Sequence, residues 1–181
     1  MRKVLLWISV LIASSLFAQQ GFDLKKYVAF KFYTNGINDE KTADYVARTL
    51  EKSQLSTFSA FNYKENIGYS IVTDAYYAHE IEKYINNMMN VRVESYEIVE
   101  LTEDLFLDIY LIKGNALSSK SKQLPPFISM GPYTQLSNDL YALAKSIWIK
   151  KYPDVYNSFF HSSPLTPEQI EEQNRKLNRK N

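Results

Sequence analysis

The stretch "FKFYTNGINDEKTADYVARTLEK", residues 30–52, predicts a β-strand, a turn and an amphipathic helix in that order. Apolar side chains occupy both faces of the segment from Tyr27 to Tyr33, which is typical of a central strand that is covered on each side. A polar loop follows, in which Asn38 is placed to cap the next helix. A single apolar stripe then recurs at helical spacing: Ala43, Val46, Ala47 and Leu50.

The segment that follows predicts a hairpin, a second helix and a last strand. Residues 56–73 form two apolar runs around "KENIG", in which Asn66 and Gly68 favour a β-hairpin turn. Residues 74–89 predict a helix that is capped by Asp74 and has one apolar stripe: Ala78, Ile81, Ile85 and Met88. Alternation over residues 90–101 places six residues on one strand face: Val91, Val93, Ser95, Glu97, Val99 and Leu101.

The order of these elements is strand, helix, strand, strand, helix, strand. It predicts an α+β fold of the ferredoxin-like kind over residues 19–101, in which an antiparallel sheet carries two helices on one face. The sequence pattern itself therefore indicates one sheet with a second face that something else must cover.

The remainder of the chain predicts a helical extension over residues 102–160. A short apolar helix is expected from Thr102 to Gly114, followed by a linker rich in Ser, Lys and Pro. A strong helix then ends before Pro153, and its apolar face is expected to pack on the open side of the sheet: Leu140, Leu143, Ala144, Ile147 and Trp148. Residues 161–181 are polar, and we expect a frayed helix or disorder there.

The first residues have the composition of a secretory signal. A basic "MRK" precedes the apolar run "VLLWISVLIASSLF", and Ala18 suits the position before a cleavage site. The sequence therefore predicts a signal peptide over residues 1–18, export to the periplasm or beyond, and no transmembrane segment after cleavage. Loss of Arg2 and Lys3 changes the formal net charge from +1 to −1.

Composition excludes several classes of function. A chain this close to neutral lacks the basic surface of a nucleic-acid binder. It contains no cysteine, so its stability after export must come from a packed core instead of disulfides. It has two histidines and shows no Ser/His/Asp set, phosphate loop or nucleotide fingerprint. We therefore predict no enzyme activity, no catalytic residue and no cofactor.

Residues Tyr27–Leu101 resemble the heavy-metal-associated domain family of copper chaperones and metal-pump sensor domains. In that family the loop after the first strand holds a Cys-x-x-Cys pair, whereas the matching stretch here is "TNGINDEKTADY". Thiolates hold monovalent copper, and hard oxygen ligands do not replace them. The resemblance thus implies the family's fold without its metal site. The segments "DLFLDIYLIKG" and "WIKKYPDVYNSF" resemble C-terminal parts of secreted Bacteroidetes proteins, which brings no activity with it.

The candidates for a different metal site are few. His79 begins a sequence like the zinc-protease helix motif, but Lys83 stands where the second histidine is required. His161 and Met89 provide the remaining soft or nitrogen ligands, and a site would need them to converge with carboxylates. The acidic side chains between Glu94 and Asp108 alternate in direction and are expected to be solvated. We predict no metal ligand among these residues.

Exposed aromatic side chains are the remaining candidates for a binding surface, because they combine a large apolar area with a polar tip. Five tyrosines are candidate partner contacts: Tyr63, Tyr69, Tyr76, Tyr77 and Tyr96. The sequence favours a non-catalytic exported module that binds a protein or cell-envelope partner through its sheet or its C-terminal region. The alternatives are a periplasmic metal-binding protein with His, Met or carboxylate ligands, and an inhibitor or prodomain-like module.

Overall fold

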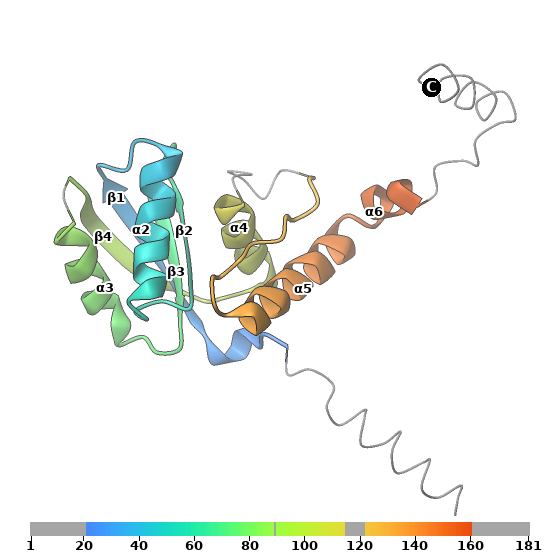
Figure 1. The fold of residues 1–181 in the computed structure, drawn as a ribbon, viewed down its shortest axis with the longest axis horizontal. Helices are drawn as coiled ribbons and strands as arrows, with labels where there is room; N and C mark the ends of the chain where they lie inside the picture. The colour runs from blue at the N-terminus through green and yellow to red at the C-terminus, as the bar shows by residue number, and fades with distance from the viewer. Residues whose placement is uncertain (1–20, 89, 115–121, 161–181) are drawn as a thin grey trace, which may run out of the picture.

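The computed structural model describes residues 21–88, 90–114 and 122–160, so the predicted signal peptide, His161, Met89 and the tail lie outside the described residues (Figure 1). The described residues form a mixed α+β structure with one four-stranded antiparallel sheet and five α-helices. In chain order the elements are η1 (Leu24–Lys26), β1 (Val28–Asn35), α2 (Glu40–Lys52), β2 (Phe58–Asn62), β3 (Ile67–Val72), α3 (Tyr77–Asn86), β4 (Arg92–Val99), α4 (Glu103–Lys113), α5 (Thr134–Lys151) and α6 (Pro153–Phe160).

The strand order in the sheet is β2-β3-β1-β4, so β1 is a central strand, as its two apolar faces predicted. The pairing of β1 with β4 contains a bulge: Tyr33 lies opposite Ser95, the next residue of β1 lies opposite Val93, and Glu94 is the extra residue. An extra residue reverses which side chains share a face. Val93 therefore joins the core beneath α2 and α3, whereas Glu97 lies on the other face. The prediction of one continuous face over residues 91–101 is wrong for this reason.

Helices α2 and α3 share one hydrophobic core with the first face of the sheet, and both predicted stripes are confirmed. The cap of α2 differs from the prediction, because Asp39 and not Asn38 occupies the N-cap position. The Asp39 Oδ1 atom accepts a hydrogen bond of 2.7 Å from the backbone N–H of Thr42. Asp74 lies before the N-cap position of α3, which Tyr76 occupies. Its carboxylate accepts a hydrogen bond of 2.9 Å from the backbone N–H of Tyr76.

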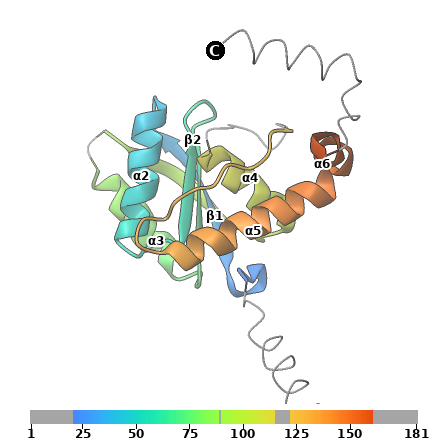
Figure 2. The ribbon, with the colours of Figure 1, turned by 45° about the vertical axis from the view of Figure 1, so that its right-hand side comes forward.

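Helix α4 lies against β2 on the second face, and α5 packs on α4 (Figures 1 and 2). The predicted ends of α4 are confirmed: the Thr102 hydroxyl caps the first turn and Gly114 follows the last. α5 ends at Lys151, Tyr152 follows as its C-cap, and Pro153 begins α6. Trp148 is fully buried in the core that joins both helices to the sheet. None of the helices described is both long and apolar enough to cross a lipid bilayer.

Two glycines allow segments to approach closely. Gly36 has φ of +91°, and a Cβ atom there would lie 1.7 Å from the carbonyl oxygen of Asn90, so the loops after β1 and before β4 can touch only at a glycine. Gly68 follows the hairpin turn, and a Cβ atom there would lie 2.1 Å from the ring of Phe61 on the neighbouring strand. The predicted hairpin is confirmed, with Asn66 supplying the left-handed turn residue at φ +56°.

Candidate functional site

The two edges of the sheet differ, and the edge formed by β2 is closed at Ser59 by two side chains. The backbone N–H of Ser59 on β2 donates to Glu51 Oε1 at 2.9 Å, and the carbonyl of Ser59 accepts from Lys113 Nζ at 2.9 Å. Lys113 Nζ also lies 2.8 Å from Glu51 Oε1 and forms an ion pair with it. The end of α2 and the end of α4 therefore satisfy both outward backbone groups of Ser59 on β2.

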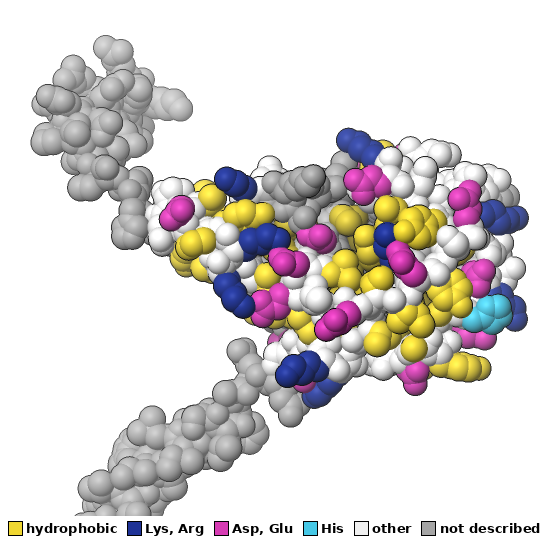
Figure 3. Space-filling model, turned by 180° about the vertical axis from the view of Figure 1, so that it is seen from behind, with side chains coloured by type: hydrophobic (Ala, Val, Ile, Leu, Met, Phe, Trp, Pro, Cys, Tyr) yellow, Lys and Arg dark blue, Asp and Glu magenta, His cyan; other side chains and the backbone are white. Residues whose placement is uncertain are grey.

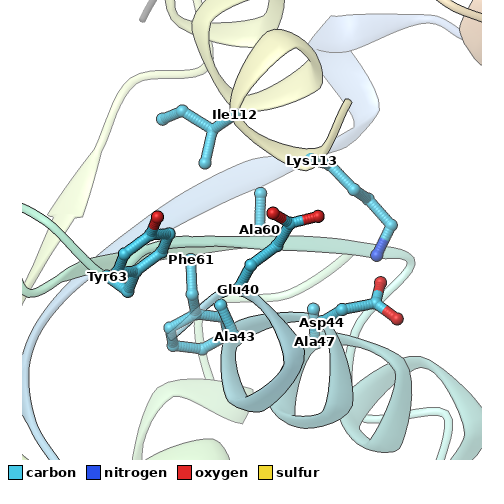
Figure 4. A pocket seen from close by; sticks show the side chains of 9 residues that line it. All are labelled: Glu40, Ala43, Asp44, Ala47, Ala60, Phe61, Tyr63, Ile112 and Lys113. Atoms are coloured by element: carbon cyan, nitrogen blue, oxygen red, sulfur yellow. The ribbon is translucent and has the colours of Figure 1, made fainter. Parts of the chain in front are cut away.

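This ion pair is buried, and the Lys113 side chain is 3% exposed. Burial lowers the pKa of Lys113, while the charge and hydrogen bond of Glu51 oppose that shift. The ammonium also lies over the ring of Phe58, 5.3 Å from its centroid. Figure 4 shows Lys113 extending from α4 towards α2 across a crevice above β2. The crevice has a volume of about 30 Å³.

The edge formed by β4 is open over most of its length. Near its start, the backbone N–H of Val93 donates to Asn86 Oδ1 at 2.7 Å, and the Arg92 guanidinium donates to the carbonyl of Asn86 at 2.8 Å, so the end of α3 is bonded to this part of β4. From Glu94 to Val99, the backbone of β4 has no hydrogen-bond partner outside β1 among the described residues. A row of outward N–H and C=O groups is a template for another strand.

Apolar side chains are exposed along this open edge. Ile98 is 57% exposed and Tyr96 is 38% exposed, both on the face that α3 covers in part. The Tyr96 ring contacts Phe30 and Phe32, with centroids 6.4 and 6.1 Å apart, so the underlying core fixes its position. The edge thus combines unpaired backbone with apolar side chains, as strand-adding binding sites do.

On the opposite face of β4, three polar side chains form a cluster. Lys31 Nζ donates to Tyr33 Oη at 2.6 Å and to Glu97 Oε1 at 2.8 Å, and Tyr33 Oη donates to the same carboxylate oxygen at 2.9 Å. The hydrogen bonds to Glu97 and Tyr33 raise the pKa of Lys31, and the bond from Lys31 lowers the pKa of Glu97. Figure 3 shows apolar side chains gathered on this side of the molecule, interrupted by charged ones.

This cluster suits binding better than catalysis. A nucleophilic or basic lysine needs a lowered pKa, whereas the pKa of Lys31 is raised and its ammonium stays charged at neutral pH. Tyr69 lies directly opposite Lys31 on β3, and burial raises the pKa of its phenol. The cluster therefore offers a fixed charge pair and two phenol groups at a half-open sheet face. Lys31, Tyr33 and Glu97 were not among the predicted contacts, because only the strand register brings them together.

The structure does not bring the five predicted tyrosines into one patch. Tyr96 lies on the open edge, and Tyr76 and Tyr77 are exposed at the start of α3, with rings in edge-to-face contact. That end of the sheet is also where β4 ends, as the pairing of β1 with β3 and β4 shows. Tyr69 is half-buried on the opposite face, beneath α4, and Tyr63 follows β2 at the far edge.

The metal candidates are separated or lie outside the described residues. His79 is exposed, and its Nδ1 atom lies 3.3 Å from a carboxylate oxygen of Glu82. In the ranges that the structure describes, no three His, Cys, Asp or Glu side chains are grouped as metal ligands would be. His161 and Met89 fall outside those ranges.

Comparisons of the chain with protein-family models, with curated proteins and with solved structures found no match.

Proposed function

We propose that the protein is an exported, non-catalytic binding module that takes up an extended polypeptide segment by strand addition at the open edge of β4. The observation that carries this proposal is the asymmetry of the sheet. The β2 edge is closed at Ser59 by a buried ion pair, whereas the outward backbone groups of β4 from Glu94 to Val99 have no partner among the described residues, and Tyr96 and Ile98 are exposed beside them. A long apolar edge in a soluble protein is an aggregation hazard unless a partner covers it.

The charge of the open edge favours a basic partner over a second copy of this chain. Glu94 and Glu100 are exposed carboxylates that form no ion pair with a described residue. Antiparallel self-pairing centred on Glu97 would set Glu94 opposite Glu100 of the second copy, and like charges directly opposite each other are destabilising. A segment that alternates apolar and basic side chains would instead cover Ile98 and neutralise the carboxylates.

The same proposal includes the fold and the location. The order β2-β3-β1-β4 places the strands as a ferredoxin-like sandwich would, with its helices after β1 and β3 on one face, which supports that topology and the likeness to heavy-metal-associated domains. Under this proposal, the loop between Asn35 and Glu40 serves as a turn and a helix cap and has no metal-binding role. The basic and apolar N-terminal sequence supports export.

Titration with two synthetic peptides tests the binding proposal. One peptide of about eight residues, the length of a strand, alternates Val and Lys, and the other alternates Val and Glu. We expect the Val/Lys peptide to shift the amide NMR signals of residues 94–99 and to slow their hydrogen exchange, and the Val/Glu peptide to do neither. Binding should weaken as salt concentration rises.

Matched substitutions locate the site. Ile98→Lys should abolish binding of the Val/Lys peptide, since it places a like charge and removes the exposed apolar contact. Tyr45→Lys, at a side chain that is 63% exposed on α2, is the control and should bind as the unmodified chain does. Shifts confined to other elements, or equal binding by the Ile98→Lys variant, would contradict strand addition at β4.

A further inference from the structure

A groove lies on the other side of the molecule from β4, between α2 and the segment that precedes α5. Figure 2 shows that segment crossing β2 and turning into α5 near the lower end of α2. The groove between them is open to solvent and has a volume of about 490 Å³. This is within the range of about 300–1,000 Å³ that is typical of small-molecule sites.

The two walls of the groove differ in chemistry. The wall before and at the start of α5 is apolar, with Met130, Pro132, Tyr133 and Leu136 facing the groove. The wall at the end of α2 and the start of β2 is polar, and its lining residues are Arg48, Glu51, Lys52, Gln54, Ser56 and Thr57. A ligand that covers both walls must be apolar along its length and polar at one end.

The charges on the polar wall determine the sign of that end. Arg48 is paired with Asp44 at 2.8 Å, and Glu51 is paired with the buried Lys113 at 2.8 Å. Lys52 is exposed and forms no ion pair with any residue in the described part of the chain. The groove therefore has one uncompensated charge, and it is positive. The amino end of α5, which no side chain caps, adds the positive end of its helix dipole to the same rim.

We infer that this groove binds a small anionic amphiphile, in which a carboxylate or similar head pairs with Lys52 and an apolar chain lies along Met130, Tyr133 and Leu136. This site is independent of the β4 edge, because the two share no residue. Ser56 is buried at the polar wall, where its single hydroxyl proton lies within reach of two backbone carbonyls, that of Phe58 at 2.9 Å and that of Ile71 at 3.1 Å, and can serve one of them at a time.

Dodecanoate and dodecanol, which share an alkyl chain length and differ in charge, test this inference on the mature chain from Gln19. We expect dodecanoate to shift the amide signals of Gln54, Thr57 and Gly131 in NMR titrations, and dodecanol to bind more weakly at the same place. Lys52→Met should weaken dodecanoate binding about three- to fivefold, as for a partly exposed ion pair, and leave dodecanol binding unchanged. Tyr133→Ala should weaken both ligands, because the side chain is half-exposed and contributes apolar contact area.

Lys41→Met, at the other end of α2, is the matched control and should not change either affinity. The inference is overturned if dodecanoate shifts no amide of the groove, if dodecanol binds the unmodified chain as tightly as dodecanoate, or if Lys52→Met and Lys41→Met behave alike. All three substituted side chains are exposed, so the variants are expected to fold. The amide shifts of the unmodified chain alone show whether the ligand binds in the groove.

Discussion

Single residues in this protein act through the partners that the sheet register gives them. In the sequence, Lys31 is a polar residue within an otherwise apolar strand. The pairing of β1 with its two neighbours places it between Tyr69 on β3 and Glu97 on β4. Its hydrogen bonds with Glu97 and Tyr33 keep the ammonium and the carboxylate ionised together. A polar residue within an apolar strand can thus belong to an ion pair with a neighbouring strand.

The pKa of Glu97 is the first quantity to measure at this scale. Lys31→Met should raise it toward its ordinary value of 4.5, because the largest cause of its lowering is the hydrogen bond from Lys31. Since the folded-state pKa of Glu97 is lowered, its contribution to stability is present above the ordinary pKa and is lost as pH falls through the folded-state value. Carboxyl-carbon NMR titration measures the shift directly. Tyr45→Phe, remote from the cluster, serves as the control, and an unchanged Glu97 midpoint in the Lys31→Met variant would show that the cluster does not form in solution.

At the scale of elements, apolar stripes at helical spacing predicted α2, α3 and α5, whereas the apolar composition and the end residues Thr102 and Gly114 predicted α4. The cap of α2 and the bulge in β4 were not predictable in the same way. Asn38 and Asp39 are both good N-cap residues, and the backbone path after Gly36 decides which one reaches the first turn. The bulge at Glu94 depends on how two strands pair, and a strand's own sequence does not contain that information.

A pair of alanine substitutions distinguishes the two possible caps. Asp39→Ala should lower the urea midpoint of unfolding, since the N–H and hydroxyl of Thr42 both donate to this carboxylate, at 2.7 and 3.1 Å. Asn38→Ala should leave the midpoint nearly unchanged. Equal effects of the two substitutions, measured by circular dichroism in urea, would contradict the assigned cap.

At the scale of the whole molecule, a buried polar contact joins the helical extension to the sheet in addition to their shared hydrophobic core. Lys113 is the last residue of α4, Glu51 lies in the last turn of α2, and both bond to Ser59 of β2. The apolar face of α5 predicted that the extension would pack somewhere. It did not indicate this polar contact, because Glu51 and Lys113 lie far apart along the chain and look like ordinary surface residues of two helices.

Removing Lys113 should therefore destabilise the molecule strongly. Lys113→Met keeps the side-chain length but leaves the buried Glu51 carboxylate without its cation, and we expect a loss of about 3–5 kcal/mol in the free energy of unfolding. Lys150→Met removes an exposed pair with Glu103 and should change little. Urea unfolding followed by the fluorescence of Trp148, the single tryptophan after the predicted cleavage site, measures both. A loss below about 1 kcal/mol for Lys113→Met would contradict a buried, energetically important pair.

The ion pair at β2 also limits how far the sheet can grow. A sheet with two usable edges has a valence of two, and its copies can stack end to end into fibrils without a natural stop. Lys113 and Glu51 close the β2 edge at Ser59, so under the proposed function a strand could be added at β4 alone, and that addition would end the growth of the sheet. We therefore expect a bound strand to leave the protein as a complex of defined size, with no further copies added to its sheet.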